Sequence, residues 1–389
     1  MNNRVLLVTS SFSAVDINDI RFIPDLSRSL AESFEVFVLA PPDGKSKLFE
    51  EWERVKIYRH RVTPIGDFGL CYGDGILPNI QKNLFRVFLI PFYLISQVFS
   101  IAYLVKKFDI KVIYANWLVP AGFSAVLFKT LFKRDLKILC TLRGSDMNLF
   151  LDPFSLLVKK FTLGGIDVLT AVSKQLSDKA HSLGYKKEIM ILPTGVNTNE
   201  FFPVGNKTIN NHKIIYVGRL IRSKGLELLV KAFALCLKKC PDASLTIIGE
   251  GDLSWDIKEQ IKKLGISDAV TLVGEVKNSD LPKYYRDSDL FCLPSLTEGF
   301  SVSVSEAFSC GLPAVTNNIP VFKELESAYG ILKSLNVENI EEFGETLAGV
   351  LLDTNFLLSV GKKVREYALK NLNRANTVQK YKIILKSLL

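Results

Sequence analysis

Short apolar runs alternate with longer segments of helical periodicity along the first half of the chain. Runs of this kind, bounded by polar or turn-forming residues, are typical of strands that are buried on both faces of a sheet. They cover residues 5–10, 35–40, 56–62, 112–117, 137–143, 168–173 and 189–193. The regular order of strand and helix predicts an α/β fold in which helices cover both faces of a parallel sheet and functional loops lie at its carboxyl edge.

A second set of apolar runs begins after a polar stretch. Residues 203–212 contain Pro, Gly and several Asn, which is typical of a linker. The runs after it cover residues 213–217, 244–248, 269–273, 290–294 and 313–316. A chain of 389 residues exceeds one ordinary hydrophobic core, so we expect two Rossmann-like domains, residues 1–203 and 204–372.

The last segment, residues 373–389, has the pattern of one more helix. Its apolar positions fall on one side of that helix, at Val378, Tyr381, Ile384, Leu385 and Leu388. A helix with one apolar side needs a partner, and we expect this one to pack on the first domain.

The segment between Val87 and Val105 approaches the length of a membrane span, because its nineteen residues are mostly apolar. Polar residues recur in it at helical spacing, at Tyr93, Ser96, Gln97, Ser100 and Tyr103. They predict a polar stripe along one side of the helix. Three interpretations stay open: a helix packed in the fold, a packed helix that also contacts a membrane surface, and a true span. The polar stripe favours the first two, which are compatible with each other.

The composition is that of a folded globular protein, with 48% hydrophobic and 23% charged residues. The net charge is +9, and the excess favours the amino-terminal half: residues 1–200 contain 25 Lys and Arg against 19 Asp and Glu, and the remainder contains 24 against 21. This balance suits an anionic membrane surface or a phosphate-bearing substrate. We find no motif that favours a nucleic acid as the partner.

The cysteines and histidines do not predict a metal site. The six cysteines form no C-x-x-C motif, and the histidines are His60, His181 and His212 alone. A zinc site would need more ligands at close spacing, so we expect no metal. No secretory signal precedes the first predicted strand, and we expect a protein of the reducing cytoplasm.

A pair of glutamates lies around a turn of small residues in the second half of the chain. Glu298 follows the apolar run 290–295, and Glu306 lies about two turns into the next helical segment. Gly299 and the serines that open this helix would offer free backbone N–H groups to an anion. For an isolated pair at this spacing, a helix cap and a solvated side chain would be the simpler interpretation.

Two cations upstream change that interpretation. Arg219 follows a predicted strand, and Lys224 lies at the start of a predicted helix. Two cations beside a helix N-terminus can hold a diphosphate without a metal, although isolated ones would usually be solvated surface charges. Together with Glu298 and Glu306, they predict a pocket for a sugar nucleotide.

The chain resembles the retaining glycosyltransferases of family 4, whose two Rossmann-like domains face each other across a cleft in the GT-B architecture. The motifs that carry the resemblance are Ala115-Asn-Trp-Leu-Val-Pro-Ala-Gly122, Thr141-Leu-Arg-Gly-Ser-Asp146, Pro193-Thr-Gly-Val-Asn197, Gly218-Arg219 with Lys224-Gly225, Gly249-Glu-Gly-Asp252, and Glu298 through Glu306. The resemblance spans nearly the whole chain and is most specific in the second half. It implies transfer of a sugar from a nucleotide-diphosphate sugar, bound mainly by the second domain, to a glycan or lipid-linked acceptor held by the first. The configuration of the sugar would be retained, and no metal or other cofactor would be needed.

The resemblance also implies roles for individual residues. Arg219 and Lys224 would clamp the diphosphate, Glu298 would lie near the donor sugar, and Glu306 would hold the ribose hydroxyls. Further donor contacts are implied for Gly218, Gly274, Glu275, Val276, Gly299, Phe300 and Ser301. Contacts on the acceptor or phosphate side are implied for Arg143, Asp146, Asn116 and Ser11.

The chain departs from the family pattern at two places. Arg143 stands where many members have a histidine, and because arginine stays protonated it cannot transfer a proton. It would instead bind a phosphate, and a structural pairing with Asp146 is the alternative. The first loop, residues 10–16, lacks the paired glycines common in the family, which weakens the case for a close backbone contact with a donor phosphate.

Two further motifs are set aside. Asp287-Ser-Asp289 has the spacing of a metal-binding pair but lies at a helix end before a buried strand. Gly249-Glu-Gly251 lacks the third glycine of a dinucleotide fingerprint, so we do not expect a dehydrogenase.

Three functions are therefore open. The first is an active transferase that builds a surface polysaccharide, such as lipopolysaccharide, or a glycolipid at the inner face of a bacterial membrane. It would contact that membrane through the helix at residues 87–105 and nearby basic residues. The second is a partner subunit that binds a sugar nucleotide without transfer, and the third is a nucleotide-sugar epimerase on the same scaffold.

Overall fold

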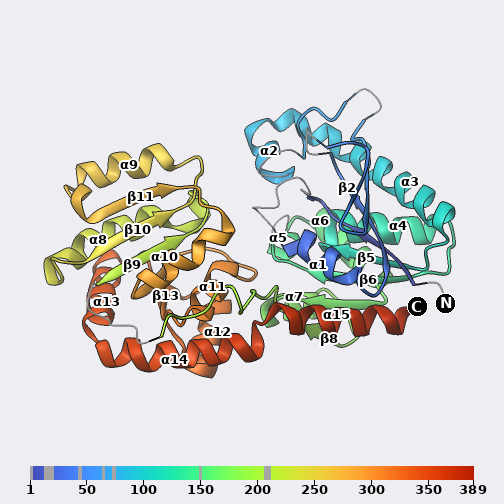
Figure 1. Cartoon of the computed structure of the whole chain (residues 1–389). Helices are drawn as coiled ribbons and strands as arrows, with labels where there is room; N and C mark the ends of the chain where they lie inside the picture. The colour runs from blue at the N-terminus through green and yellow to red at the C-terminus, as the bar shows by residue number, and fades with distance from the viewer. Residues whose placement is uncertain are drawn as a thin grey trace. The chain divides into compact units, whose positions relative to one another are not determined.

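The computed structural model describes residues 3–12, 22–42, 46–63, 66–71, 76–148, 151–205 and 212–389. The chain forms two compact units (Figure 1). The first unit comprises Met1–Leu192 and Thr377–Leu389, and the second comprises Pro193–Asn376. Residues 13–16 of the first loop and 206–211 of the expected linker lie outside the described residues.

The first unit contains a parallel sheet with one antiparallel edge strand. Its strand order is β3-β4-β2-β1-β5-β6-β7-β8. The bounds are β1 (Arg4–Val8), β2 (Glu35–Ala40), β3 (Phe49–Trp52), β4 (Val55–Arg59), β5 (Val112–Asn116), β6 (Lys137–Leu142), β7 (Val168–Ala171) and β8 (Ile189–Ile191). The strand that the apolar pattern did not predict is β3, which pairs antiparallel with β4. Its sequence, Phe-Glu-Glu-Trp, is half exposed and carries two charges, as suits an edge strand.

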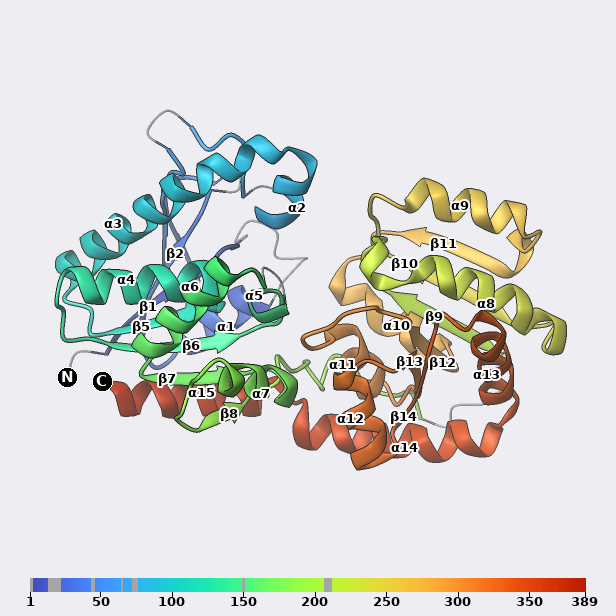
Figure 2. The same ribbon diagram turned by 180° about the vertical axis from the view of Figure 1, so that it is seen from behind.

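Helices cover both faces of this sheet. They are α1 (Phe22–Leu30), α2 (Ile76–Lys82), η1 (Leu84–Leu89), α3 (Ile90–Phe108), η2 (Leu118–Gly122), α4 (Phe123–Leu131), α5 (Ser145–Asn148), α6 (Pro153–Gly165), α7 (Lys174–Ser182) and α15 (Arg374–Leu388). Figure 2 shows α3, α4 and α6 side by side along one face. Strand residues alternate between the faces: the ring centre of Phe37 lies 4.4 Å from that of Phe108 of α3, while Val38 packs with α1 and α15 on the other face.

The closing helix α15 contributes to the core of the first unit. Tyr381 is fully buried, its ring lies 5.3 Å from that of Tyr114, and its hydroxyl lies 3.2 Å from Thr141 Oγ1. Val378, Ile384 and Leu385 join the same cluster. The apolar side noted in the sequence is therefore the side that packs on the first sheet.

The second unit is built on a six-stranded sheet in which every pair is parallel. Its strand order is β11-β10-β9-β12-β13-β14. The strands are β9 (Lys213–Val217), β10 (Ser244–Ile248), β11 (Val270–Gly274), β12 (Leu290–Leu293), β13 (Ala314–Asn317) and β14 (Leu332–Leu335). The α-helices are α8 (Leu226–Lys239), α9 (Ser254–Lys263), α10 (Leu281–Asp287), α11 (Val302–Ser309), α12 (Pro320–Tyr329), α13 (Ile340–Leu352) and α14 (Thr354–Asn371). Five of the strands match the predicted runs, and β14 is the addition.

The second unit begins at Pro193, earlier than the expected boundary after residue 203. The reason is that two apolar side chains in this stretch, Val196 and Phe201, are buried in the second core. The N–H of Val196 also donates to Leu372 O at 2.8 Å, immediately before α15 begins. Apolar side chains and main-chain hydrogen bonds thus attach residues 193–201 to the second unit. The polar composition that predicted a linker begins only at residue 203.

The helix predicted between Val87 and Val105 is formed by α3 and the end of η1. Part of its polar stripe faces the interior of the first unit. Tyr93 and Gln97 are buried and bonded to each other at 3.1 Å. The exposed side carries Phe92 and Phe99 instead. The sequence predicted a polar stripe without saying which side it occupies, and the structure places its members differently: Tyr93 and Gln97 are buried, whereas Tyr103 is exposed. Helical spacing shows which residues share a side but not which side is covered.

Among the described residues, one helical stretch, Leu84–Phe108, is long and apolar enough to cross a membrane by length and composition. Only 28% of its most apolar window is buried. Its inner side nevertheless packs within the first unit, where Val98, Ile101 and Leu104 are almost completely buried. The helix is therefore part of the fold and has a second, uncovered apolar side.

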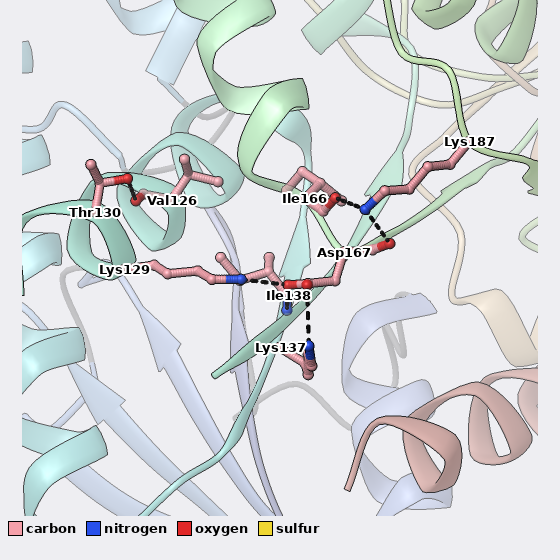
Figure 3. A network of polar contacts seen from close by, with 8 residues as sticks. All are labelled: Val126, Lys129, Thr130, Lys137, Ile138, Ile166, Asp167 and Lys187. Atoms are coloured by element: carbon pink, nitrogen blue, oxygen red, sulfur yellow. Dashed lines mark hydrogen bonds and ion pairs between the residues drawn. The ribbon is translucent and has the colours of Figure 1, made fainter. Parts of the chain in front are cut away.

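A polar network attaches α4 to the amino ends of β6 and β7 (Figure 3). The carboxylate of Asp167 accepts from Lys129 of α4 at 2.7 Å and from the N–H of Ile138 at 2.9 Å. Lys137 lies 3.7 Å from the same carboxylate, and Lys187 donates to the carbonyl of Asp167. Burial acts to raise the pKa of Asp167, but these bonds and charges outweigh it and lower the pKa. The network holds the α4 layer on the sheet.

Candidate active site

The order of strands in the second sheet places a site at one point of its carboxyl edge. The chain builds β9, β10 and β11 in one direction and then returns to add β12 on the other side of β9. Loops diverge where the order reverses, and open α/β sheets bind ligands at that point. The loops after β9 and β12 carry the predicted residues Arg219, Lys224 and Glu298.

The loops after β9 and β12 are in close contact. Gly225 has a left-handed backbone, with φ of 67°, and a Cβ at this position would lie 2.2 Å from the carbonyl oxygen of Pro294. Only glycine combines this conformation with this approach. The N–H of Leu296 donates to Ser223 O at 2.9 Å and closes the contact.

This contact brings Lys224 and Glu298 together. Lys224 Nζ lies 2.5 Å from Glu298 Oε1, and the two side chains are 21% and 9% exposed. A charge-assisted hydrogen bond at this burial holds both groups in place, and each neutralises the other. The predicted cation and the predicted carboxylate thus form one unit at the point where the strand order reverses.

Arg219 lies in the segment between β9 and Lys224 and is exposed. Its carbonyl accepts from the hydroxyl of Tyr216 at 2.9 Å. Burial and the charge of Glu298 raise the pKa of Tyr216, whereas the charge of Arg219 acts against them. Both charges therefore act on one hydroxyl. Within the described part of the chain Arg219 forms no ion pair, so its guanidinium can bind an anion.

Glu306 is placed differently from Glu298. It lies on α11, whose first turn is capped by Ser301, with Oγ accepting from the N–H of Val304 at 3.2 Å. The Glu306 side chain is buried, and its Oε2 accepts from the Tyr285 hydroxyl at 2.9 Å. Burial raises the pKa of Glu306 to about 7, although the bond from Tyr285 opposes the rise. Tyr285 carried no sequence signal, because its pairing with Glu306 depends on how α10 packs on α11.

The other predicted donor residues line the same edge of the second sheet. Gly218 follows β9, and its N–H donates to Ile248 O at 3.0 Å. Gly274 ends β11 and accepts from the N–H of Gly249 at 2.8 Å. Glu275 is exposed, while Val276 and Phe300 are partly buried against the second core. Gly299 lies between Glu298 and Phe300 and is half-buried. These residues share an edge, and no contact joins Glu275 to Glu298.

The first sheet has its own reversal of strand order, between β1 and β5. Asn116 ends β5, and Arg143 follows β6, the next strand. Arg143 Nη2 donates to Asn116 Oδ1 at 2.8 Å, and the guanidinium lies 4.4 Å from the ring centre of Phe22. Ser11, after β1, is exposed, and its carbonyl accepts from the Thr9 hydroxyl at 3.0 Å. The structure therefore joins Asn116 to Arg143 and adds Phe22, a residue with no motif to reveal it.

Asp146 holds the main chain around it in place through backbone hydrogen bonds. Its buried carboxylate accepts from the backbone N–H groups of Leu118 at 2.8 Å, Gly144 at 2.8 Å and Arg143 at 3.2 Å. Burial raises its pKa in spite of these bonds. Asp146 thus binds the main chain of Arg143, and Asn116 binds the guanidinium.

One group of side chains in the described residues could in principle hold a metal. It comprises His212, Cys240 and Asp242, whose ligand atoms lie within 4.8 Å of one another. It lies at the amino end of β9, at the opposite edge of the sheet from Lys224. Burial raises the pKa of Cys240 to about 11, so the thiol keeps its proton, and His212 already bonds Asp242 at 2.8 Å. This group does not belong to the candidate site.

Two family models match the chain. A family model described as Glycosyl transferases group 1 matches residues 197–368, and one described as Glycosyltransferase Family 4 matches residues 21–200. Together the two matches cover nearly the whole chain, which therefore belongs to the family 4 glycosyltransferases of group 1. The first match contains the whole Lys224 and Glu298 site, and the second contains Asn116, Arg143 and Asp146.

Relatives of this glycosyltransferase act on different molecules. It is 23% identical to N-acetyl-alpha-D-glucosaminyl L-malate synthase of Bacillus anthracis, over 80% of this chain and 85% of that protein. It is also 23% identical to the GDP-mannose-dependent alpha-(1-6)-phosphatidylinositol monomannoside mannosyltransferase of Mycobacterium tuberculosis, over 59% of this chain and 64% of that protein.

Solved structures show that this glycosyltransferase has the GT-B fold. Sucrose-phosphate synthase from Thermosynechococcus elongatus has a TM-score of 0.79 at 19% identity, and 99% of each chain is covered. Anabaena HepE in complex with UDP has a TM-score of 0.75 at 17% identity, covering 99% of this chain and 100% of that chain. At such identities the likeness concerns the fold alone.

Proposed function

We propose that this glycosyltransferase transfers a sugar, with retention of configuration, from a nucleotide-diphosphate sugar bound by the second unit to a glycan or lipid-linked acceptor bound by the first. The observation that carries the proposal is the ion pair of Lys224 with Glu298, next to Arg219 at the reversal of strand order. A cation that is already paired with a carboxylate is held in position until an anion replaces that partner.

The main contribution of this site to the reaction would be electrostatic. When the bond between sugar and diphosphate breaks, negative charge grows on the leaving diphosphate. Lys224 and Arg219 would stabilise it, a contribution worth several kcal/mol in a site shielded from water. Two cations of the chain would perform this role, so the proposal requires no metal or other cofactor. Glu298, released from Lys224, would hold hydroxyls of the donor sugar.

Glu306 would bind the ribose of the donor. Its carboxyl group already accepts a hydrogen bond from Tyr285, so one oxygen is fixed and the other is left for a hydroxyl pair. Asn278 approaches that second oxygen at 3.5 Å, which is a weak bond that a ribose hydroxyl can replace. The neighbouring backbone of Gly274, Glu275 and Val276 would meet the base.

Arg143 would bind a negatively charged group of the acceptor or donor. A guanidinium cannot act as a proton acceptor at any physiological pH, so its role is charge and position. Asn116 and the ring of Phe22 fix its plane. A fixed plane suits a phosphate or carboxylate, which can accept two parallel N–H bonds. Ser11 would lie on the same acceptor side.

A membrane-linked acceptor fits the first unit. Its α3 has an exposed apolar side and ends in Lys106 and Lys107. We place the protein in the cytoplasm at the inner face of a bacterial membrane, in contact with it through the helix at residues 87–105 and nearby basic residues. Synthesis of a surface polysaccharide such as lipopolysaccharide supplies acceptors at that face. The Mycobacterium relative is named for a phosphatidylinositol acceptor, which is in keeping with this assignment.

Transfer assays with a panel of UDP-, GDP- and ADP-sugars and bacterial membrane extracts test the proposal. The wild-type chain should label the extract from one donor class. Lys224→Ala should lower the rate by about 100-fold or more, as the loss of a fixed charge at a reacting centre does. Arg222→Ala is the matched control: Arg222 is an exposed cation two residues away in the same short turn and should change the rate only a few-fold.

Other outcomes contradict the proposal in distinct ways. Tight binding of a sugar nucleotide without any transfer would identify a partner subunit. Conversion of the nucleotide sugar to its isomer without an acceptor would identify an epimerase. Equal effects of Lys224→Ala and Arg222→Ala would remove the special role given to the ion pair.

A further inference from the structure

Large apolar side chains are exposed on two helices of the first unit, and not on α3 alone. Phe88 of η1, and Phe92 and Phe99 of α3, are 72%, 53% and 63% exposed. On α6, Phe154 and Leu157 are 74% and 64% exposed. Exposed apolar side chains gathered in this way mark a contact with a membrane or with another protein.

The exposed side chains of the two helices face the same way. On η1 and α3 they recur at Phe88, Phe92 and Phe99, opposite the buried side that contains Ile101. On α6 they recur at Phe154, Leu157 and Phe161, opposite the buried Leu163. Both helices cover one face of the first sheet and both pack against α4, which lies between them in Figure 2. Their outer sides therefore point away from the same sheet.

The α4 layer joins the two helices into one surface. The ring of Phe161 on α6 lies 6.0 Å from the ring of Phe123 on α4. The ion pair of Lys129 with Asp167 holds α4 on the sheet (Figure 3). We call the outer side of α3, α4 and α6 the three-helix face. It is attached firmly enough to act as a single plane.

The exposed charges within the helices of the three-helix face are positive, and exposed acidic residues flank them at the helix ends, at Asp109 after α3 and Asp152 before α6. The helices contain Lys106 and Lys107 in α3, Lys129 in α4, and Lys159 and Lys160 in α6, and no Asp or Glu lies within their bounds. Lys106, Lys107 and Lys160 are exposed beside the apolar rings. Rings and long ammonium side chains together fit the boundary between acyl chains and anionic headgroups. A second copy of this face would meet its own positive charge, which disfavours a dimer through it.

We propose that α3 and α6 together dock the first unit flat on an anionic lipid bilayer. This deepens the membrane contact in the proposed function, on which it rests, by adding α6 as a second contact. A single interfacial helix leaves the protein free to roll about the helix axis, whereas two helices on one plane fix the roll. The inner side of α3 stays in the core of the first unit, so the helix lies on the bilayer and does not cross it.

A fixed roll has a consequence for the acceptor. The helix α6 begins at Pro153, shortly after Arg143 and Asp146 at the carboxyl edge of the first sheet. Phe154, in the first turn of α6, is therefore a docking residue near the edge that carries the acceptor residues. An acceptor sugar on a lipid would reach Arg143 without its lipid leaving the bilayer.

Vesicle flotation with the full chain, without any donor, tests the docking directly. The vesicles contain phosphatidylcholine alone or phosphatidylcholine with phosphatidylglycerol. The chain should float with the anionic vesicles and be released from them by salt. Phe92→Ser with Phe99→Ser, and separately Phe154→Ser with Leu157→Ser, should each lower the partition coefficient about tenfold or more, since each pair removes two large apolar side chains from the contact. The matched control is Trp255→Ser, which removes a 70% exposed ring from α9 of the second unit and should bind like the wild type.

A second measurement reports on the plane itself. All six native cysteines are buried, so a cysteine introduced at the surface can be labelled selectively with a polarity-sensitive fluorophore. Labels at Phe99→Cys and at Leu157→Cys should both brighten when anionic vesicles are added. A label at Leu358→Cys, on an exposed position of α14 in the second unit, should not.

Several results would overturn the proposal. In flotation, they are absence of binding to anionic vesicles, or an α6 variant that floats at the wild-type level. In the labelling experiment, it is a label at residue 157 that stays in water while the label at residue 99 brightens. Without lipid, it is a dimer that the α3 or α6 substitutions abolish. The vesicle experiments contain no sugar nucleotide, so their failure would leave the transferase proposal intact. Conversely, flotation by a chain that transfers no sugar would reject the transferase proposal and leave the docking in place.

Discussion

At the residue scale, the buried carboxyl group of Glu306 couples stability to pH. Burial raises its pKa from 4.5 to about 7. Between these values the unfolded chain loses a proton that the native protein keeps, so the free energy of unfolding should fall as pH rises. The full loss, reached above pH 7, is roughly 2–4 kcal/mol. Urea titrations at pH 5 and pH 8 measure it.

Glu306→Gln removes this titration and keeps an acceptor for the hydroxyl of Tyr285. The variant should gain stability relative to the wild type at pH 8 and show no such gain at pH 5. Glu366→Gln, at an exposed position of α14, is the control and should follow the wild type at both values. A Glu306→Gln variant that follows the same pH dependence as the wild type would assign the effect to another group.

The ion pair of Lys224 and Glu298 makes a prediction about ligand affinity. In the proposed function Lys224 binds a diphosphate and leaves Glu298 to do so, which makes the ion pair a competitor of the ligand. Glu298→Gln should therefore bind free UDP or GDP more tightly than the wild type, by a few-fold to about tenfold, as loss of a partly exposed ion pair allows. Transfer should fall at the same time, because the donor sugar loses its carboxylate. Calorimetry and transfer rates measure the two effects, and weaker nucleotide binding by the variant would refute the competition.

At the element scale, Gly225 sets the distance between the loops after β9 and β12. Alanine there would combine a left-handed backbone with a Cβ 2.2 Å from Pro294 O, so the loop must move and carry Lys224 with it. Gly330→Ala is a matched control, since Gly330 has a φ of 59° but an open site without atoms within 4 Å. The control should cost about 1 kcal/mol of unfolding free energy, and Gly225→Ala should cost more and also weaken nucleotide binding. Urea titrations and calorimetry decide, and equal costs would show that the close contact is unimportant.

Elements were predictable from sequence where apolar patterning decides their position. Buried parallel strands such as β1 and β12 appear as continuous apolar runs, whereas the half-exposed edge strand β3 does not. The orientation of α3 was not predictable, because both of its sides are apolar and the polar pair Tyr93 and Gln97 bonds inside the core. A helix of this kind shows its buried side only once the elements beside it are placed.

The site was predictable in part for the same reason. Positions just after buried strands lie at the carboxyl edge of a parallel sheet. The structure has Arg219, Lys224 and Glu298 at that edge, after the neighbouring strands β9 and β12, while their roles stay predictions. The contacts of Tyr285 with Glu306 and of Phe22 with Arg143 join separate elements through packing. No local spacing encodes such pairs.

At the scale of the whole molecule, the chain forms the first unit from its two ends. It leaves that unit after Leu192 and returns at Thr377, so the first core is complete only when α15 is in place. Tyr381 is a large residue of α15 at the centre of this core: it is fully buried, its ring lies 5.3 Å from that of Tyr114, and its hydroxyl bonds Thr141. Tyr381→Ala should lower the unfolding free energy of the first unit by about 3–5 kcal/mol.

The three tryptophans allow this loss to be assigned to one unit. Trp52 and Trp117 lie in the first unit and Trp255 in the second, so fluorescence in a Trp255→Phe background follows the first unit alone. Ile383→Ala on the same helix is the control, because Ile383 is 61% exposed and should change stability by less than about 0.5 kcal/mol. Selective loss of the first unit in Tyr381→Ala would show that Thr377–Leu389 complete the core formed by Met1–Leu192. Loss in both units together would instead show that the two unfold as one cooperative body, and no loss would remove α15 from the core of the first unit.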